Sequence, residues 1–468
     1  MRAYHDSDLA ADDGGEVMPE PLPGQDAVFV ESVEISSLFG KYEYRLPKDG
    51  GGLNPRLFIL YGDNGTGKTT ILFLLHHLLS RSTKRGHKSA IARVPFKFVN
   101  VNFSNGNSLR VERSDPSSRD FTFRICRGQT TVIKRLYVAN SFGIIPPMEA
   151  KGDVQAEENL NNVYDQLIGL QSYTLTDDRQ LDSDQLADEY LQMTEGREDE
   201  KKGIQVMPYR RLGLDSALSD SHLASAIQRA GQWADAQFRS DTSSGTTNVN
   251  AIYLDLLNRI GSGKQKEQSN SPDQIRSALV TKVNRLEDRI EQHVKFGLEP
   301  PLPTDHFRER IWSMADRDIE LAAHVLEPYF DGVDARLKAQ QTTVHTIYSF
   351  LSTLNQYYRD KKVLFHAESG FMVQYESGDH LPTRSLSSGE RQLLTIFCNV
   401  MAARANPCLF MVDEPEISLN IKWQRRLVDS LLECTLNSGI QLAMASHSFE
   451  LLSAHSEDVV TLNQGGGM

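Results

Sequence analysis

The chain has 468 residues, a formal net charge of −12 and four widely spaced cysteines, which excludes a small fold held together by disulfides. Because the cysteines form no CxxC pair and no metal-ligand grouping with histidine, we expect a reduced, cytoplasmic protein without a zinc site. No run approaches the ~20 apolar residues of a membrane span, and the acidic charge argues against indiscriminate nucleic-acid binding. Nucleic acid remains a possible partner only if it binds a local basic patch, and the candidate patch is Arg81, Lys84, Arg85 and Lys88.

Four regions follow one another along the chain. Residues 1–27 are polar, acidic and rich in Gly and Pro, which predicts a disordered leader. Residues 28–147 alternate short β-favouring runs with turn clusters around one strongly apolar helix, which predicts a strand-rich lobe. Residues 148–339 are polar and helix-forming, broken by Gly/Ser linkers, so we expect a mainly helical insertion. Residues 340–468 continue as helix and strand in alternation, which predicts a parallel sheet.

Two amphipathic helices are marked in and after the insertion. Ser271, Pro272 and Gln274 form a capping-box start for the first, and a second apolar stripe runs from Val344 to Tyr358 in near-heptad steps. Each helix is compatible with a short coiled-coil arm or with ordinary packing against a core, and core packing is the commoner use. With the acidic stretch between residues 177 and 189, these helices make the insertion a predicted docking surface for a partner protein.

The segment LFILYG-DNGTGKTT-ILFLLHHLL is an apolar run, a Gly-rich loop and an apolar helix, in that order. This is the context of a P-loop, in which glycines let backbone N–H groups face phosphates and the helix N-terminus adds partial positive charge. We expect Lys68 to reach the β- and γ-phosphates of ATP and Thr69 to ligate Mg²⁺. The predicted ATP-binding residues are Gly62, Asp63, Asn64, Gly65, Thr66, Gly67, Lys68, Thr69 and Thr70.

The segment CLFMVDEPE is an apolar strand that ends in two adjacent carboxylates. A buried strand beside the P-loop strand delivers Asp413 to the sheet edge, where it holds Mg²⁺ through its water shell. Glu414, the next residue, is then expected to lie where a general base would polarise the attacking water. Taken alone, the pair is equally compatible with an acidic turn after a core strand.

Further segments carry a family resemblance. SLSSGERQLL resembles the ABC signature, whose serine hydroxyl and glycine amides bind the γ-phosphate held by the opposite subunit; it departs from LSGGQ at Ser388 and Glu390. As a bare string, it also fits an ordinary N-capped helix. The apolar strand in QLAMASHS ends at His447, which resembles the catalytic switch histidine, and Asn420 lies in a segment that resembles the D-loop. The resemblance implies that the signature residues acting in trans are Ser387, Ser388, Gly389 and Glu390.

The four motifs occur in the order of an ABC-type ATPase. The implied fold is an α/β P-loop NTPase head with a β-rich N-terminal lobe and a helical insertion between the P-loop and the signature. Residues 28–147 and 340–468 would be the two halves of the head. ATP and Mg²⁺ are the implied cofactors, and the implied assembly is a homodimer closed through ATP, with a higher homo-oligomer built from it. The turn near Asn140 and Ser141 follows the last expected strand of the first lobe, as a Q-loop would, but it contains no glutamine, so no Q-loop is assigned.

Three phrases narrow the resemblance: LFGKYEYRL, FLSTLNQYYRDKKVLF and DEPEISLNIKWQRRL. They are similar to the SMC/OLD-like ATPases of bacterial anti-phage defence systems, most of all the AriA ATPases of PARIS and next the PtuA ATPases of Septu. The resemblance implies an ATPase that senses a phage-derived trigger. About twenty residues follow His447, too few for the nuclease domain of OLD proteins, so we expect a separately encoded toxic effector, a nuclease. The alternatives are a SMC/RecF-like DNA-repair ATPase and a non-hydrolysing, ATP-dependent scaffold.

Overall fold

The computed structural model describes residues 27–82, 85–146, 151–176, 181–184, 222–242, 271–379 and 381–462. The expected leader lies outside the described residues apart from Ala27, as do Lys84 and part of the acidic stretch between residues 177 and 189. Within the described part of the chain, no helix is both long enough and apolar enough to cross a membrane.

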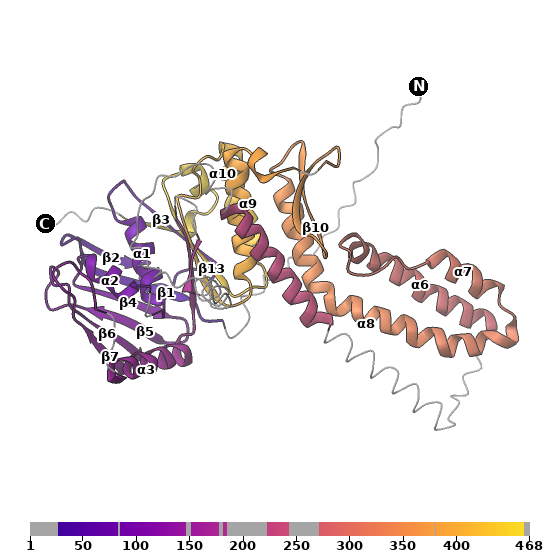
Figure 1. The fold of residues 1–468 in the computed structure, drawn as a ribbon, viewed down its shortest axis with the longest axis horizontal. Coiled ribbons are helices and arrows are strands. Elements are labelled where there is room, and N and C mark those ends of the chain that lie inside the picture. The colour runs from indigo at the N-terminus through magenta and orange to yellow at the C-terminus, as the bar shows by residue number, and fades with distance from the viewer. Residues whose placement is uncertain are drawn as a thin grey trace, which may run out of the picture.

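The first lobe is built on a six-stranded antiparallel sheet in the order β2-β1-β4-β5-β6-β7. Buried and half-buried residues alternate along β4, β5 and β6, as they do in a sheet that covers a core with one face. Helix α3 (Lys151–Leu167) packs against β6 and β7 (Figure 1). The strands are β1 (Val30–Leu38), β2 (Tyr42–Leu46), β4 (Phe98–Phe103), β5 (Asn107–Glu112), β6 (Phe121–Arg127) and β7 (Thr130–Tyr137).

The second sheet has the order β14-β3-β13-β12-β8-β9, and only its β8–β9 pair is antiparallel. It is the parallel sheet that the alternation of helix and strand predicted. Its central strands are apolar and buried along their length, as parallel strands covered on both faces are. The strands are β3 (Leu57–Tyr61), β8 (Gln171–Leu175), β9 (Leu181–Asp182), β12 (Cys408–Asp413), β13 (Ile440–Ser446) and β14 (Val459–Thr461).

Two hydrophobic cores lie on opposite faces of the parallel sheet. Phe58 and Leu60 of β3 face the core that contains α1 (Lys68–Leu79), α2 (His87–Arg93) and the first sheet, whereas Leu57 and Ile59 face the other core. This division follows from the alternation of side chains along a strand. The second core is covered by a helix over residues 222–242, α9 (Ser388–Ala403), α10 (Ile421–Cys434) and the hairpin of β10 (Lys361–His366) and β11 (Gly370–Tyr375). The short elements η1 (Thr383–Ser385), α11 (Phe449–Leu452) and η2 (Ser456–Asp458) complete this half.

Helix α6 (Pro272–Lys295) begins with the predicted capping box. The backbone N–H of Gln274 donates to Ser271 Oγ (3.3 Å), and the backbone N–H of Ser271 donates to Gln274 Oε1 (2.9 Å). Gly297 follows the helix with a φ of +70°, in the left-handed region that favours glycine. The local sequence therefore determines both ends of α6.

Helix α8 (Asp316–Asn355) joins two bodies. Its first part packs with α6 and α7 (Thr304–Ser313) around a separate small core that includes Leu286 and Val333. Its last part carries the stripe from Val344 to Leu354 into the core of the head. Figure 1 shows α6, α7 and the first part of α8 projecting from the head; we call residues 272–339 the arm. The apolar stripe of α6 and the stripe from Val344 thus each pack into a hydrophobic core, which the sequence analysis gave as the commoner use of such helices.

The expected insertion at residues 148–339 needs one correction, because its first part belongs to the two sheets. Residues 171–175 form β8, which pairs in parallel with β12, the strand that ends at Asp413. Helix α3 covers the first sheet. The run QSYTL is short and half polar, and its polar Ser172 is buried where its hydroxyl lies 3.1 Å from His76 Nδ1. Such a strand is stabilised by partners distant in sequence, so its own pattern does not reveal it.

Candidate nucleotide-binding site

The P-loop connects β3 to α1 and is shaped by its glycines. Gly65 and Gly67 have φ values of +83° and +90°, which L-residues rarely adopt. A Cβ atom on Gly62 would lie 2.7 Å from the carbonyl oxygen of Leu462. Helix α1 has no side-chain cap and no acidic residue in its first turn. Its N-terminal N–H groups and partial positive charge are therefore available to an anion.

Lys68, the first residue of α1, folds back over this loop. Its Nζ donates to the carbonyl oxygens of Gly62 (2.7 Å) and Asp63 (3.2 Å) and lies 3.4 Å from His447 Nδ1. Burial lowers the pKa of Lys68, and the charge of Glu414 is the largest opposing influence. The ammonium group is therefore poised among carbonyl oxygens and carboxylates, where phosphate oxygens could replace its intraloop acceptors.

The other P-loop side chains divide into two groups. The Thr66 hydroxyl donates to the Asp63 carbonyl oxygen at 2.8 Å and is buried, so Thr66 stabilises the loop itself. Thr70 is half-buried on the first turn of α1. By contrast, Thr69, Asp63, Asn64 and Gly65 are exposed. Thr69 is the P-loop hydroxyl that is open to a ligand at the helix start.

Asp413 and Glu414 lie at the carboxyl end of β12, in the middle of the parallel sheet. The Glu414 backbone has a φ of +48°, and its N–H donates to the carbonyl oxygen of Ala445 on β13 at 2.8 Å. Glu414 Oε1 lies 3.9 Å from His447 Nε2. Lys68, Glu414 and His447 thus meet where three neighbouring strands end. That edge is where α/β sheets bind their ligands.

The oxygen donors at this edge fit the predicted Mg²⁺. The exposed Thr69 hydroxyl and the Asp413 carboxylate are the hard ligands that Mg²⁺ prefers, and the uncapped helix start suits a phosphate chain. Thr69 and Asp413 are the residues that would hold the ion.

Glu416 begins the segment that resembles the D-loop, and the sequence analysis gave its side chain no role of its own. Its Oε1 accepts hydrogen bonds from Ser446 Oγ (2.7 Å), from the His447 N–H (2.8 Å) and from the Ser448 N–H (3.1 Å). One carboxylate therefore fixes the backbone on both sides of His447. The DEPE run places Glu416 near the strand end, but only the fold shows which loop it holds.

Thr176, which follows β8, and Gln392 of α9 are two further site residues that the sequence analysis missed. A small cavity beside the carboxylate pair is lined by Thr176, which follows β8, and by Gln392 of α9. Gln392 Nε2 donates to the Pro415 carbonyl oxygen at 2.9 Å, which ties α9 to the loop after β12.

The turn near Asn140 is held by its own hydrogen bonds. The Asn140 side chain accepts from the N–H groups of Phe142 and Ile144 within that turn.

The signature segment forms the start of α9. Ser387 is its N-cap: Ser387 Oγ accepts from the Glu390 N–H at 3.3 Å, and Glu390 Oε2 accepts from the Ser387 N–H at 2.7 Å. Lys361 Nζ donates to the same carboxylate at 2.8 Å. A Cβ atom on Gly389 would lie 2.7 Å from the Ser418 carbonyl oxygen. This glycine therefore allows α9 to approach the loop after β12.

The signature stands apart from the P-loop of its own chain. Ser387 and Ser388 are exposed, and among the described residues no hydrogen bond or ion pair joins residues 387–390 to residues 62–70. Asn420, the predicted D-loop residue, caps α10, because its side chain accepts from the Trp423 N–H at 3.1 Å. The structure thus brings together Lys68, Glu414 and His447 and leaves the signature facing outward.

Comparison with known proteins gives a family. Residues 39–452 match the family model described as AAA ATPase domain, and no curated protein matches the chain. Similar solved structures include the Smc head domain with an extended coiled coil, bound to the C-terminal domain of ScpA, from Pyrococcus furiosus (12% identity, 91% of each chain, TM-score 0.38). Another is SmcHead bound to the C-winged helix domain of ScpA (9% identity, 91% of this chain and 92% of that one, TM-score 0.38). With its P-loop and its mixed α/β architecture, the chain belongs to the AAA ATPase domain family.

Proposed function

We propose that the protein binds Mg²⁺ and ATP and hydrolyses the ATP. The observation that carries this proposal is the meeting of Lys68, Glu414 and His447 at the carboxyl edge of the parallel sheet. When bound, ATP supplies the phosphoanhydride bond and Mg²⁺ neutralises part of its charge. Lys68 turns its ammonium group from the loop carbonyls towards the phosphates. Glu414 accepts the proton of the attacking water, and His447 orients that water.

The experiment is steady-state ATP hydrolysis by the wild-type chain and by Glu414→Gln. The variant is expected to bind ATP and to turn it over about 10²-fold more slowly or worse, the scale of general-base loss. Glu368→Gln, at an exposed position on the β10–β11 hairpin, is the matched control and keeps wild-type turnover. Equal turnover by Glu414→Gln and Glu368→Gln would assign the base elsewhere.

The exposed signature supports a composite site in a homodimer. Ser387 and Ser388 lie at the uncovered start of α9 and touch no P-loop residue of their own chain among the described residues. In the proposed dimer they complete the site that contains the partner's P-loop. Two chains then enclose two nucleotides, and such dimers are the units from which a higher homo-oligomer is built. The scaffold alternative differs in one respect: it closes on ATP without turnover.

The narrower proposal is a role in the bacterial cytoplasm as a sensor ATPase of an anti-phage defence system. In this role the protein would be most similar to the AriA ATPases and, after them, to the PtuA ATPases. It rests on the three motif phrases and on the arm. A phage-derived trigger would act on the ATPase, which controls a separately encoded nuclease effector. The competing SMC/RecF-like repair function predicts that duplex DNA binds the chain and stimulates its turnover. Unstimulated turnover with DNA present would exclude the repair function.

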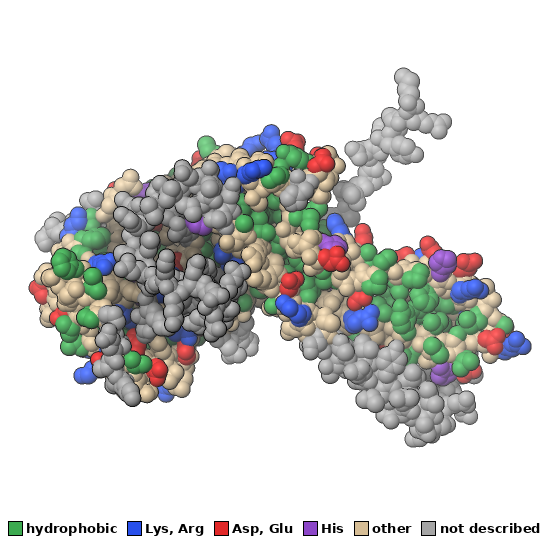
Figure 2. All heavy atoms as spheres, viewed as in Figure 1, with side chains coloured by type: hydrophobic (Ala, Val, Ile, Leu, Met, Phe, Trp, Pro, Cys, Tyr) green, Lys and Arg blue, Asp and Glu red, His purple; other side chains and the backbone are tan. Residues whose placement is uncertain are grey.

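The arm is the surface that we propose for the effector. Leu321 and Val325 lie one helical turn apart on α8 and are 71% and 65% exposed, and Trp312 of α7 is 54% exposed. Figure 2 shows hydrophobic side chains on the visible face of the arm. Clusters of exposed apolar side chains are typical of protein interaction sites. Helix α8 continues from this surface into the core of the head, so the docking surface and the ATPase share one element.

The test is a pull-down of the protein encoded beside the ATPase gene. The double variant Leu321→Ser and Val325→Ser is expected to bind ATP normally and to lose the effector. Leu136→Ser, a change at an exposed position on β7, is the matched control and keeps it. Retention of the effector by the double variant as strong as by the control would rule out docking on the arm.

A further inference from the structure

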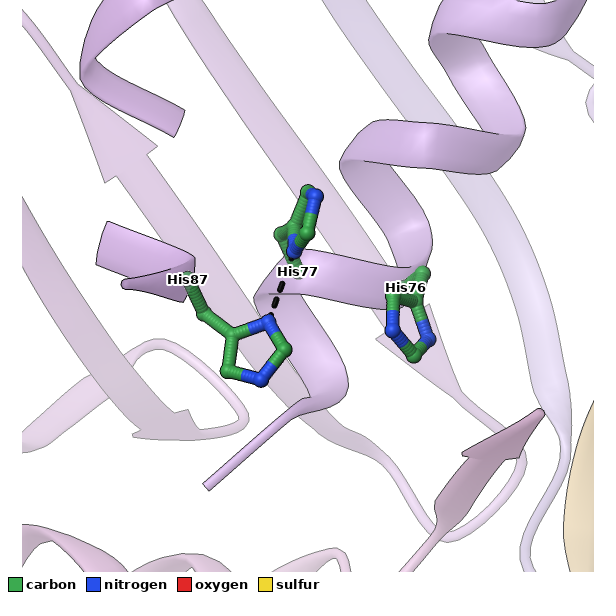
Figure 3. Close-up of side chains that lie close together, drawn as sticks. All are labelled: His76, His77 and His87. Atoms are coloured by element: carbon green, nitrogen blue, oxygen red, sulfur yellow. Dashed lines mark hydrogen bonds between the residues drawn. The ribbon is translucent and has the colours of Figure 1, made fainter. Parts of the chain in front are cut away.

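Three buried histidines lie together at the end of α1 that is remote from the P-loop. His76 and His77 are in its last turn, and His87 is the first residue of α2. The three residues are 1%, 6% and 2% exposed. A ring nitrogen of each lies within 4.8 Å of a ring nitrogen of the other two, and Figure 3 shows the rings of His77 and His87 turned towards each other with His76 beside them.

Carboxylates lie beside two of these histidines. Asp184 Oδ1 lies 2.9 Å from His87 Nε2, and Asp182 Oδ2 lies 3.6 Å from His76 Nε2. The Ser172 hydroxyl lies 3.1 Å from His76 Nδ1, so His76 gives up one of these two contacts when it binds a metal. With its Nε2–H donated to Asp184, His87 presents the lone pair of Nδ1 to the inside of the cluster, where it faces His77 Nδ1 at 2.7 Å. A carboxylate on the outer ring nitrogen is the arrangement that fixes the tautomer of metal-binding histidines.

Burial disfavours the charged form of two of these imidazoles. Burial lowers the pKa of His77 well below its ordinary value, and the charges of His76 and His87 lower it further. Burial likewise lowers the pKa of His87, although Asp184 opposes the shift. Neutral imidazole is the form that binds metals.

We propose that His76, His77 and His87 bind a zinc ion. Three imidazole nitrogens suit zinc, whereas Mg²⁺ and Ca²⁺ prefer oxygen ligands. Tetrahedral zinc with Zn–N bonds of about 2.0–2.1 Å places its ligand nitrogens about 3.3 Å apart. His77 Nδ1 and His87 Nδ1 therefore separate by roughly half an ångström, and two bonds to the ion replace the hydrogen bond between them.

The proposed zinc site is separate from the nucleotide site. His77 lies nine residues beyond Lys68 on α1, about 14 Å along the helix axis. Bound zinc would join the end of α1 to the start of α2, and the carboxylates of Asp182 and Asp184 extend the connection to β9 and the residues after it. The expectation of no zinc site rested on the cysteines, and these three histidines have no ligand spacing that their sequence reveals.

The test measures the metal content of the full-length, tag-free chain by elemental mass spectrometry, after dialysis and without nucleotide. The wild-type chain is expected to retain one zinc per chain, and His77→Gln and His87→Gln about a tenth of that or less. His324→Gln, at an exposed position on α8, and Lys68→Ala are expected to retain the full amount. Equal zinc in His87→Gln and His324→Gln would overturn the proposal.

A second measurement does not depend on the folding of the variants. Titration of the zinc-free wild-type chain with Co²⁺ is expected to give the visible d–d absorption of a tetrahedral site with nitrogen ligands, and zinc should abolish it. A folded wild-type chain that neither retains zinc nor gives this absorption would also overturn the proposal.

Discussion

The carboxylate of Glu416 accepts the backbone N–H of His447 at 2.8 Å, although 31 residues separate them. The same oxygen accepts from Ser446 Oγ and the Ser448 N–H. We therefore expect Glu416→Ala to displace His447 and to lower kcat about 10²-fold, the scale of a 1 Å misplacement. The KM for ATP is expected to change little, because among the described residues no hydrogen bond or ion pair joins the Glu416 side chain to the P-loop. Steady-state kinetics measures both, and Glu416→Gln, whose amide oxygen still accepts hydrogen bonds, should recover part of kcat. An unchanged kcat in Glu416→Ala would mean that His447 is held by other contacts.

Lys68→Ala removes the ammonium group that is nearest to the P-loop carbonyl oxygens. ATP affinity, measured by isothermal titration calorimetry, is expected to fall by about 100-fold or more, because a charge-assisted contact to phosphate is among the strongest hydrogen bonds. Lys362→Ala, at an exposed position on β10, should bind ATP like the wild type. Near-normal affinity in Lys68→Ala would contradict the P-loop assignment.

Mixing two inactive variants tests the composite site. Ser387→Arg disables the signature of one chain, and Lys68→Ala disables the P-loop of another. In a heterodimer of the two, one site keeps an intact P-loop and an intact signature, so ATPase activity is expected to return in part. The measurement is ATP turnover at several mixing ratios of the two variants. A tag on one variant changes its size, so that heterodimers can be detected and subunit exchange demonstrated. No recovery despite demonstrated exchange would count against the trans arrangement.

The Lys361–Glu390 ion pair predicts a pH dependence of stability. Burial on its own raises the pKa of Glu390, but the hydrogen bonds from Lys361 and Ser387 outweigh it, so the pKa lies below its ordinary value. A depressed carboxyl pKa stabilises the fold above the unfolded-state pKa of about 4.5, and this contribution is lost as the pH falls through the folded-state value. At pH 7 we expect Glu390→Gln to lower the free energy of unfolding by about 1 kcal/mol.

That difference should shrink as the pH falls below about 4.5. Chemical denaturation of both chains at several pH values measures it. A difference that stays constant down to acid pH would show that the capping hydrogen bonds, and not the ion pair, carry the effect.

Features that depend on neighbouring residues were predictable from the sequence. The capping box at Ser271 forms as expected, since its partners lie within one turn. The P-loop glycines adopt their left-handed backbone between the expected strand and helix. Both involve contacts that a short window of sequence contains.

Features that depend on distant partners were not predictable. β8 is a strand because it pairs with β12, more than 230 residues later. Glu416 has a role because a separate strand delivers His447 beside it. The carboxylates of Asp182, in β9, and of Asp184, which follows β9, reach His76 and His87 although 106 and 97 residues separate the partners. In each case, the two partners are far apart in sequence.

The uninterrupted course of α8 has a geometric consequence. Measured along its bent axis, its 40 residues have a length of about 60 Å (Figure 1), and the part within the arm, residues 316–339, accounts for about 36 Å of that length. The end of α8 that packs in the head lies near α9 and α10, the helices that follow the signature and the catalytic strand. A rotation of roughly 10° at that end would sweep the tip of the arm through about 6 Å. Ångström-scale adjustments around a bound nucleotide would thereby be amplified into a displacement as large as a helical turn.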